Sequence, residues 1–244
     1  MIDTNMENPR KFINDWPLLN ITQRPGLDFQ SNEAYKSLRS NIDFCGDDVK
    51  VIAITSCLPN EGKSSVSFNL AISIAESGKK VLFIDSDMRK SVLSRRFGFS
   101  KSQGGLSYFL AGKQLLKEVI HETNIKNLHI IPTGAVPPNP AELLGVKRLP
   151  EALAILRRAY DYIIIDTPPL GSVIDSALVA KNCDGVAIVI AAKEVSRKFA
   201  KRVINQLQKA DCQILGVILN KVDLGGKYYG KYYGKYYGKY YGEE

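Results

Sequence analysis

The chain has 244 residues, 45% of them hydrophobic and 24% charged, which is typical of one globular domain with tails. No apolar run reaches the roughly 18 residues of a membrane span, and the N-terminus lacks the apolar core of a signal peptide, so we expect a cytoplasmic protein. The four cysteines show no metal-binding spacing, and the net charge of +8 is compatible with nucleic acid, anionic lipid or acidic protein partners.

Residues 1–30 are polar and interrupted by prolines, which predicts an extended N-terminal arm. A few apolar residues of this arm are candidates to dock onto a surface: Phe12, Trp16, Leu18 and Leu19. Residues 30–44 then carry apolar side chains at four-residue spacing, which predicts a charged helix with one apolar stripe. On the residues alone, a solvated helix face is favoured over a functional role for Glu33, Lys36 and Arg39.

The stretch from Val51 to Ser65 joins a β-branched strand to a helix through a turn that ends in Gly62, Lys63 and Ser64. This pattern predicts a phosphate-binding P-loop: Gly62 allows the backbone to approach a triphosphate, Lys63 reaches the β and γ phosphates, and Ser64 binds Mg²⁺. Cys57 stands where the GxxxxGK[ST] pattern has its first glycine. The alternative is an ordinary strand, turn and helix that happens to contain these three residues.

A helix over residues 64–77 and a buried strand over residues 81–84 complete a predicted βαβ unit, with Gly78 ending the helix. Asp85 and Asp87 follow this strand, at the edge where open α/β sheets bind ligands. If the strand continues, both carboxylates point the same way, towards Mg²⁺ or an attacking hydroxyl. Ordinary strand-end or helix-capping aspartates are the alternative.

Residues 90–126 carry no recognisable chemistry, although short helices are predicted over 106–110 and 115–120. A strand over 128–131 is followed by a proline-rich turn, a helix that starts near Ala141 and a second helix over 149–159. The two histidines, His121 and His129, have no evident catalytic partner and fit solvated or structural roles.

The strand over residues 162–165 is closed by Asp166, the Walker B arrangement that holds Mg²⁺ or its water beside a P-loop. Two more parallel strands are predicted over 186–190 and 214–219, with a helix over 197–210 between them. Asn220 then opens the sequence NKVD, which reads equally well as a base-contacting strand end or as a polar turn.

The composition changes abruptly after residue 224, where four KYYG repeats predict a disordered tail over 225–244. Tyrosines interleaved with lysines can stack on single-stranded nucleic acid, or they can accept phosphate. The tail tyrosines are Tyr228, Tyr229, Tyr232, Tyr233, Tyr236, Tyr237, Tyr240 and Tyr241.

The order of these motifs, LPNEGKS, then DSDMR, then IIIDTPP, then a tyrosine-rich terminus, resembles the bacterial tyrosine kinases of capsule and exopolysaccharide synthesis, the BY-kinases. The resemblance implies a ParA/MinD-like P-loop domain over 31–224: a three-layer α/β fold with a mainly parallel central sheet and helices on both faces. It implies an ATP-dependent autokinase that phosphorylates the tail tyrosines and so regulates polysaccharide synthesis or export.

The resemblance also assigns roles to single residues. Asp85 becomes the expected general base for the tyrosine hydroxyl, Lys63 and Asp87 complete the catalytic set, and Mg²⁺ is held by Ser64, Asp87 and Asp166. Contacts to ATP are expected from Pro59, Asn60, Glu61, Gly62, Lys63, Ser64, Ser65, Arg89 and Asn220. The family's ExxRxxR oligomer motif falls on Glu33, Lys36 and Arg39, where Lys36 replaces the middle arginine and weakens bidentate pairing.

The expected partners follow from the same resemblance. They are further copies of the chain in a ring-like homo-oligomer such as an octamer, a transmembrane adaptor of the polysaccharide co-polymerase type that brings the chain to the membrane, and a cognate tyrosine phosphatase. Nucleic acid is not expected. Two alternatives stay open: a ParA/MinD-like nucleotide-switched ATPase that binds DNA or membrane, and an ATP-dependent module whose tail binds nucleic acid. Against the first, the lysine of the KGG opening in those ATPases is missing from Ser56-Cys57-Leu58.

Overall fold

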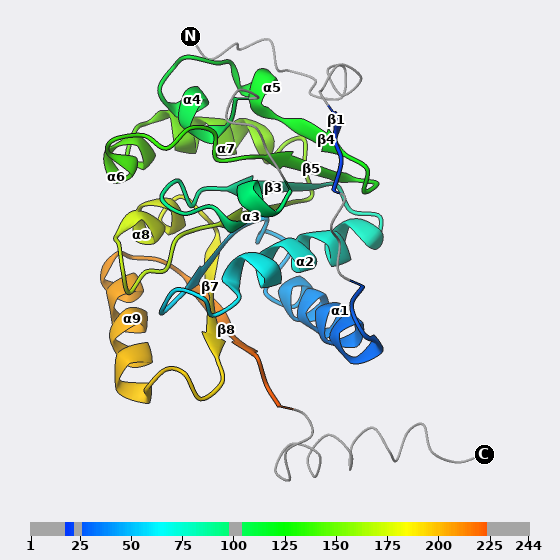
Figure 1. Cartoon of the computed structure of the whole chain (residues 1–244), viewed down its shortest axis with the longest axis vertical. Coiled ribbons are helices and arrows are strands. Elements are labelled where there is room, and N and C mark those ends of the chain that lie inside the picture. Colours follow the sequence, from blue (N-terminus) through cyan, green and yellow to red (C-terminus); the bar gives the residue numbers. More distant parts are fainter. Residues whose placement is uncertain (1–17, 22–25, 98–103, 224–244) are drawn as a thin grey trace, which may run out of the picture.

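The computed structural model describes residues 18–21, 26–97 and 104–223. These residues form a sheet of eight strands in the order β1-β4-β5-β3-β6-β2-β7-β8 (Figure 1). The strands are β1 (Leu18–Leu19), β2 (Val51–Ser56), β3 (Val81–Asp85), β4 (His121–Thr123), β5 (Leu128–Ile131), β6 (Tyr162–Asp166), β7 (Gly185–Ala191) and β8 (Ile214–Asn220). The predicted tail with its tyrosines, and the arm up to residue 17, lie outside the described residues.

The sheet is parallel except where β4 runs antiparallel to β5. The central strands β2, β3 and β6 are buried runs of mainly β-branched and apolar residues, as expected for strands covered on both faces. Their runs of apolar and β-branched residues predicted these strands to within one residue at each end.

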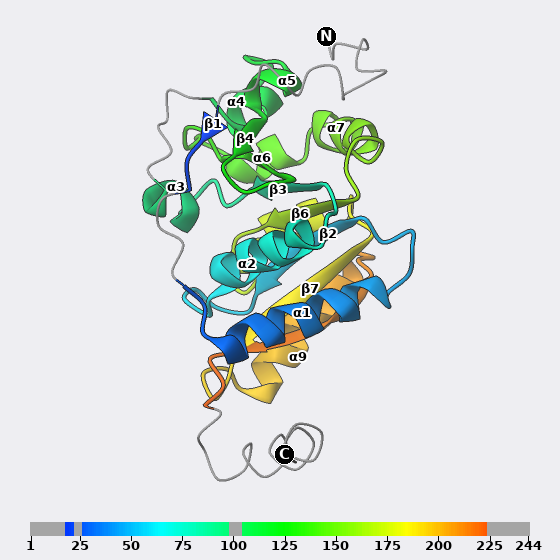
Figure 2. The ribbon, with the colours of Figure 1, turned by 90° about the vertical axis from the view of Figure 1, so that its right-hand side faces the viewer.

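Helices cover both faces of the sheet, as predicted. They are α1 (Phe29–Asp43), α2 (Lys63–Glu76), α3 (Val92–Arg96), α4 (Leu106–Leu110), α5 (Leu116–Val119), α6 (Pro140–Leu144), α7 (Arg148–Leu156), α8 (Asp175–Ala180) and α9 (Arg197–Lys209). In the view of Figure 2, α1 and α2 lie in front of the sheet and α9 lies behind it.

Strand β3 shows how the two faces are sorted, because successive side chains of a strand point to opposite sides. Val81 and Phe83 pack in the core under α2, whereas Leu82 and Ile84 pack in the core under α4 to α7. A third group of apolar side chains joins β7 to α8 and α9. The three-layer P-loop NTPase fold expected from the sequence is therefore confirmed.

The N-terminal arm is more ordered than the sequence indicated. Leu18 and Leu19 form β1 and pair in parallel with β4, and Leu19 and Ile21 are buried. Leu19 thus docks on the core as expected, but as part of the sheet. Helix α1 starts at Phe29, before the predicted domain boundary at 31, because the Asp28 side chain accepts a hydrogen bond from the Ser31 N–H at 2.7 Å and caps the helix.

Several smaller predictions are also settled. The backbone of Gly78, just after α2, has φ +92°, the left-handed conformation of a helix C-terminal glycine. The four cysteines are free thiols. His129 bonds to the Tyr160 hydroxyl at 2.8 Å within the core layer, and His121 is buried, so both histidines are structural. None of the helices in the described part of the chain is long and apolar enough to cross a membrane.

Candidate active site

The P-loop connects β2 to α2, and its backbone adopts the conformations that its residue types permit. Asn60 and Gly62 have φ of +66° and +85°, in the left-handed region that asparagine and glycine tolerate best. Gly62 stands at the N-cap of α2 and has no side chain to bond to the first turn. The N–H groups at the start of this 14-residue helix are therefore available to an anion.

Cys57, at the position of the first glycine in the P-loop pattern, is closely approached by another segment of the chain. Cys57 is fully buried among apolar side chains between β7, α8 and α9. Its carbonyl oxygen lies 2.1 Å from the position that a Cβ on Gly171 would occupy. Gly171, in the loop that follows β6, thus makes a close backbone contact at this end of the P-loop.

Two residues brace the P-loop from within. Glu61 is 1% exposed, and its carboxylate accepts hydrogen bonds from the Leu58 N–H at 2.6 Å and the Ala191 N–H at 3.0 Å. The Asn220 side-chain amide donates to the Glu61 carbonyl at 2.8 Å. The Glu61 carboxylate therefore ties the loop to the end of β7, which leaves its backbone to face a phosphate.

Asn220 also lies against the next P-loop residue. A Cβ on Gly62 would come within 2.2 Å of the Asn220 side-chain nitrogen, so a larger residue there would displace Asn220 and strain a backbone with φ +85°. Asn220 is the last residue of β8, and the strand end therefore contacts the P-loop directly. The first residue of the NKVD sequence therefore lies against the P-loop. Pro59 and Asn60 are exposed at the tip of the loop.

Lys63 and Asp166 form the buried ion pair at the centre of the site. Lys63 Nζ lies 2.7 Å from Asp166 Oδ1 and 3.1 Å from Ser64 Oγ, with Lys63 only 6% exposed. Ser67, one turn along α2, donates to the same Asp166 oxygen at 3.0 Å. The predicted Walker A and Walker B residues are thus brought together, with the lysine held on the carboxylate.

Asp85 lies beside this pair because β3 and β6 are neighbours in the sheet and place Asp85 opposite Asp166. Burial, and then the charge of Asp166, raise the pKa of Asp85 to about 8, and the Ser91 hydroxyl donates to its carboxylate. Asp85 is thus a buried carboxyl group that keeps its proton to a higher pH than an exposed aspartate does.

The condition under which Asp85 and Asp87 would point the same way, a strand that continues past Asp85, is not met, since β3 ends at Asp85. The chain turns there, and the Asp87 N–H bonds to Asp85 Oδ1 at 3.2 Å. Asp87 is nevertheless buried close to the site: burial raises its pKa, and the nearby charge of Lys63 opposes this. The Asp87 carboxylate therefore reaches the site because the chain turns after Asp85, and not because Asp85 and Asp87 alternate along one strand.

Arg89 points to a partner that the sequence did not reveal. Its guanidinium binds both carboxylate oxygens of Asp175, at 2.8 and 3.0 Å, and these hydrogen bonds raise the pKa of Arg89. Asp175 is 1% exposed and starts α8. The pair joins the turn after β3 to α8 at the edge of the site.

The site offers oxygen ligands for a hard cation in Ser64, Asp87 and Asp166. Among residues 18–21, 26–97 and 104–223 there is no group of three or more His, Cys, Asp or Glu arranged to hold a metal by itself. A hydroxyl and two carboxylates are oxygen ligands of the kind that bind Mg²⁺ together with waters and substrate phosphates.

Comparisons with known proteins agree with this geometry. Residues 49–218 match a family described as AAA domain. The chain is 41% identical over 215 residues to the tyrosine-protein kinase CpsD of Streptococcus pneumoniae serotype 4, covering 87% of this chain and 94% of that protein. The CpsD of Streptococcus agalactiae is 40% identical over 194 residues, 80% and 85% of the two chains. The chain belongs to the bacterial tyrosine-protein kinases.

Solved structures place the kinase fold in the same group. The kinase domain of the Escherichia coli tyrosine kinase ETK is similar with a TM-score of 0.76 and 34% identity, covering 83% of this chain and 84% of that one. The septum site-determining protein MinD of Pyrococcus horikoshii is similar with a TM-score of 0.60 and 30% identity, covering 70% and 69%. The kinase domain is thus the nearer of these two P-loop structures.

The three residues predicted for the kinase's oligomer interface lie along α1. Lys36 Nζ pairs with Glu33 Oε1 at 2.7 Å; the Lys36 side chain is exposed and the Glu33 side chain is partly exposed. Arg39 instead turns inward and donates to the Ser73 carbonyl on α2 at 2.8 Å. Glu33 and Lys36 are therefore available to a neighbouring subunit, whereas Arg39 anchors α1 to its own subunit.

Proposed function

We propose that this kinase transfers the γ-phosphoryl group of ATP to the tyrosines of its own C-terminal tail. The observation that carries the proposal is the buried set of Lys63, Asp166 and Asp85 beside an uncapped helix N-terminus, in a chain closely similar to named tyrosine-protein kinases. Such a set positions a triphosphate, neutralises its charge and supplies a base, which phosphoryl transfer requires.

Each residue contributes one step. The N–H groups of the P-loop and the first turn of α2 bind the β and γ phosphates, and Lys63 leaves Asp166 to contact the γ phosphate. Asp85, once ionised, accepts the proton of the tyrosine hydroxyl while the tyrosine oxygen forms a bond to the γ phosphorus. The bond from that phosphorus to the β-phosphate oxygen breaks, and ADP leaves.

Mg²⁺ fits this site through the Ser64 hydroxyl and the carboxylates of Asp87 and Asp166. When bound, it neutralises charge on the β and γ phosphates. Asn220 and Arg89 lie at the rim of the same site and are proposed to contact the nucleotide.

The tail is the proposed acceptor because of where its root lies. Asn220 contacts the P-loop, and the tyrosine-rich stretch begins a few residues later at Tyr228. Eight phosphates at about −1.5 to −2 each would convert a tail with four lysines and two glutamates into a strongly acidic one. Repulsion between such tails would then loosen an assembly of several chains.

The wider role follows from the kinship with CpsD and belongs to the same proposal. The kinase regulates the synthesis or export of capsular polysaccharide or exopolysaccharide. It works as a ring-like oligomer in the cytoplasm, at the membrane through a transmembrane adaptor of the polysaccharide co-polymerase type, and a cognate phosphatase resets its tail.

The test is incubation with Mg-ATP, with the adaptor's cytoplasmic segment present, followed by mass spectrometry of the tail. We expect phosphotyrosine within residues 228–241. Lys63→Met should lower its rate of formation on the order of 100-fold or more, because the positive charge at the transferring group is lost. Lys79→Met, which removes an exposed lysine beyond the end of α2, is the matched control and should leave the rate unchanged. ATP hydrolysis without phosphotyrosine would instead support a nucleotide-switched ATPase.

A further inference from the structure

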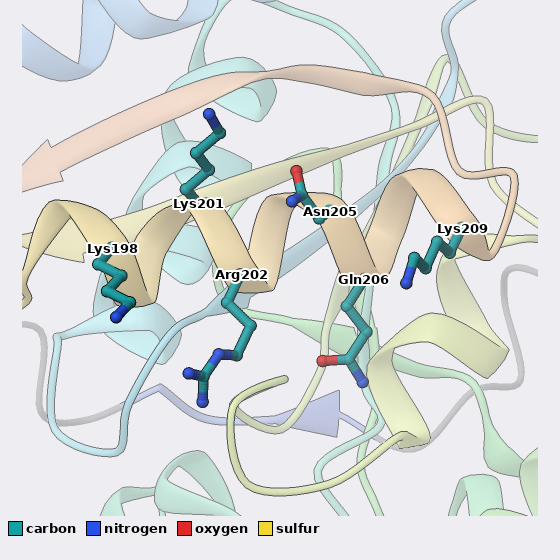
Figure 3. Close-up of a pocket in the computed structure, with 6 residues that line it drawn as sticks. All are labelled: Lys198, Lys201, Arg202, Asn205, Gln206 and Lys209. Carbon is teal, nitrogen blue, oxygen red and sulfur yellow. The ribbon is translucent and has the colours of Figure 1, made fainter.

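Helix α9 carries a strongly basic outer face that the active site does not use. Figure 3 shows six polar side chains spaced along it, which line a hollow of about 540 Å³: Lys198, Lys201, Arg202, Asn205, Gln206 and Lys209. The helix contains no acidic residue between Arg197 and Lys209. The cations therefore lie along one side of three helical turns without an acidic residue among them.

The opposite face of α9 holds the helix in place. Val203 and Leu207 are buried against β7 and α8, with Phe199 packed beside them. The outer cations Lys198, Lys201, Arg202 and Lys209 are all exposed. Within the part of the chain that the structure describes, none of these four forms an ion pair with a carboxylate. The basic face is thus a fixed surface whose charge is uncompensated.

The root of the tail lies at the N-terminal end of this face. The Asn220 carbonyl accepts a hydrogen bond from the Ala192 N–H at 2.8 Å, and Lys221 Nζ pairs with Glu194 Oε1 at 3.0 Å. Residues 192–194 lead directly into α9, whose N-cap is Ser196. The chain therefore leaves the described fold next to the first turn of the basic face.

The tail is long enough to cover the face. Helix α9 has 13 residues and is about 20 Å long. The 21 residues from 224 to 244 span at most about 70 Å when extended. Before phosphorylation the four tail lysines outnumber the two glutamates, so the tail and the face repel each other. Phosphorylated tyrosines reverse that sign and offer oxygens that pair well with lysine and arginine.

We propose that the phosphorylated tail docks on the basic face of α9 of its own chain. This inference rests on the proposed function for the source of the phosphates. Docking holds the product tail along α9 and leaves the P-loop free for a tail that still lacks phosphate. The contact is electrostatic and exposed, so it weakens as ionic strength rises.

A peptide measurement tests the contact without requiring activity. The probe is a fluorescent peptide of residues 225–244 with phosphate on all eight tyrosines, titrated against the full chain carrying Lys63→Met, whose own tail stays unphosphorylated. We expect saturable binding that the unphosphorylated peptide does not show and that inorganic phosphate at equal phosphate concentration does not displace.

Matched charge removals locate the binding. In the same background, Lys201→Gln, Arg202→Gln and Lys209→Gln together should weaken the phosphopeptide Kd about tenfold or more, because three charge-assisted contacts are lost. The control removes three equally exposed cations elsewhere, Lys79→Gln, Lys147→Gln and Arg158→Gln, and should change the Kd less than twofold. Equal weakening by both sets, or no binding at all, would overturn the proposal. Circular dichroism checks that both variants are folded.

Acetylation of lysines, followed by mass spectrometry, tests docking within one chain. After autophosphorylation, Lys198, Lys201 and Lys209 should react several-fold more slowly, while Lys79 and Lys147 should react as before. The protection should not depend on protein concentration. If the protection of the α9 lysines grows with protein concentration, the tail of a neighbouring chain covers the face. If phosphatidylglycerol vesicles protect these lysines and tail phosphorylation does not, the face binds lipid. Either result overturns the proposal. If no tail phosphate forms, the proposed function fails, and the peptide measurement still decides the docking.

Discussion

At the scale of single residues, Asp85 carries the clearest pH signature. Its folded-state pKa of about 8 lies above its ordinary value of 3.8, so between these values the folded protein binds a proton that the unfolded chain has released. Protonated Asp85 therefore makes its whole contribution to the free energy of unfolding below about pH 4. That contribution falls by up to about 1.4 kcal/mol per pH unit as the pH rises towards 8. Above pH 8 the loss is complete.

Asp85→Asn should remove this dependence in nucleotide-free protein kept in EDTA. Urea unfolding at pH 5, 6, 7 and 8 should show a flatter decline in the free energy of unfolding for the variant, and a more stable variant than wild type at pH 8. A residual slope is expected, because the pKa of Asp87 is also raised. Asp211→Asn, an exposed carboxylate, is the control and should follow the wild-type profile. Parallel profiles for Asp85→Asn and wild type would contradict the burial argument.

The sequence predicted some site residues and missed others for a physical reason. Lys63, Asp85 and Asp166 were predicted because each directly follows a loop or strand whose local pattern fixes its place. Ser67 and Asp175 were missed because only tertiary packing decides which helix face meets Asp166 or Arg89. The roles of the predicted residues in catalysis, metal binding and oligomer contact stay predictions.

At the scale of elements, the P-loop depends on a glycine in the loop after β6. A Cβ on Gly171 would lie 2.1 Å from the Cys57 carbonyl and 2.9 Å from Phe199 Cζ. The backbone of either Gly171 or Cys57 must therefore shift to make room. We expect Gly171→Ala to lower the free energy of unfolding by about 1 to 3 kcal/mol. Because the displaced backbone includes the start of the P-loop, ATP affinity should fall as well.

Chemical denaturation and titration with a fluorescent ATP analogue measure the two effects. Gly216→Ala is the matched control, since a Cβ there meets nothing within 4 Å, and it should leave both quantities nearly unchanged. Normal stability and nucleotide affinity in Gly171→Ala would show that the loop accommodates a methyl group.

The elements that the sequence missed share a cause. The buried strands of the sheet were predictable from their apolar runs, but β1 has two residues, β4 has three and includes a histidine and a glutamate, and α8 follows a turn with only six residues of its own. Segments this short show no measurable period. Strand β1 pairs with β4, more than a hundred residues away in sequence, and β4 is also held by antiparallel pairing with β5.

At the scale of the whole molecule, assembly is expected to depend on the outer side of α1. Glu33→Lys reverses the charge of a partly exposed side chain, so an interface with cations from a neighbour should turn repulsive. Light scattering after size exclusion should then report a smaller species than wild type at low salt. Glu151→Lys on α7, exposed on another part of the surface, should retain the wild-type size. An unchanged mass for Glu33→Lys would exclude this side of α1 as the contact.

The hydrogen bond from Asn220 to the Glu61 carbonyl has a consequence for energetics as well as for geometry. It connects the last residue of β8, which within the described residues lies at the edge of the sheet beside β7, to the P-loop. Thermodynamic linkage is reciprocal. If bound nucleotide changes the free energy of holding the end of β8 in place, then holding that end in place changes the free energy of nucleotide binding by the same amount. Restraint of the tail should therefore change nucleotide affinity, and nucleotide binding should change how firmly the tail is restrained.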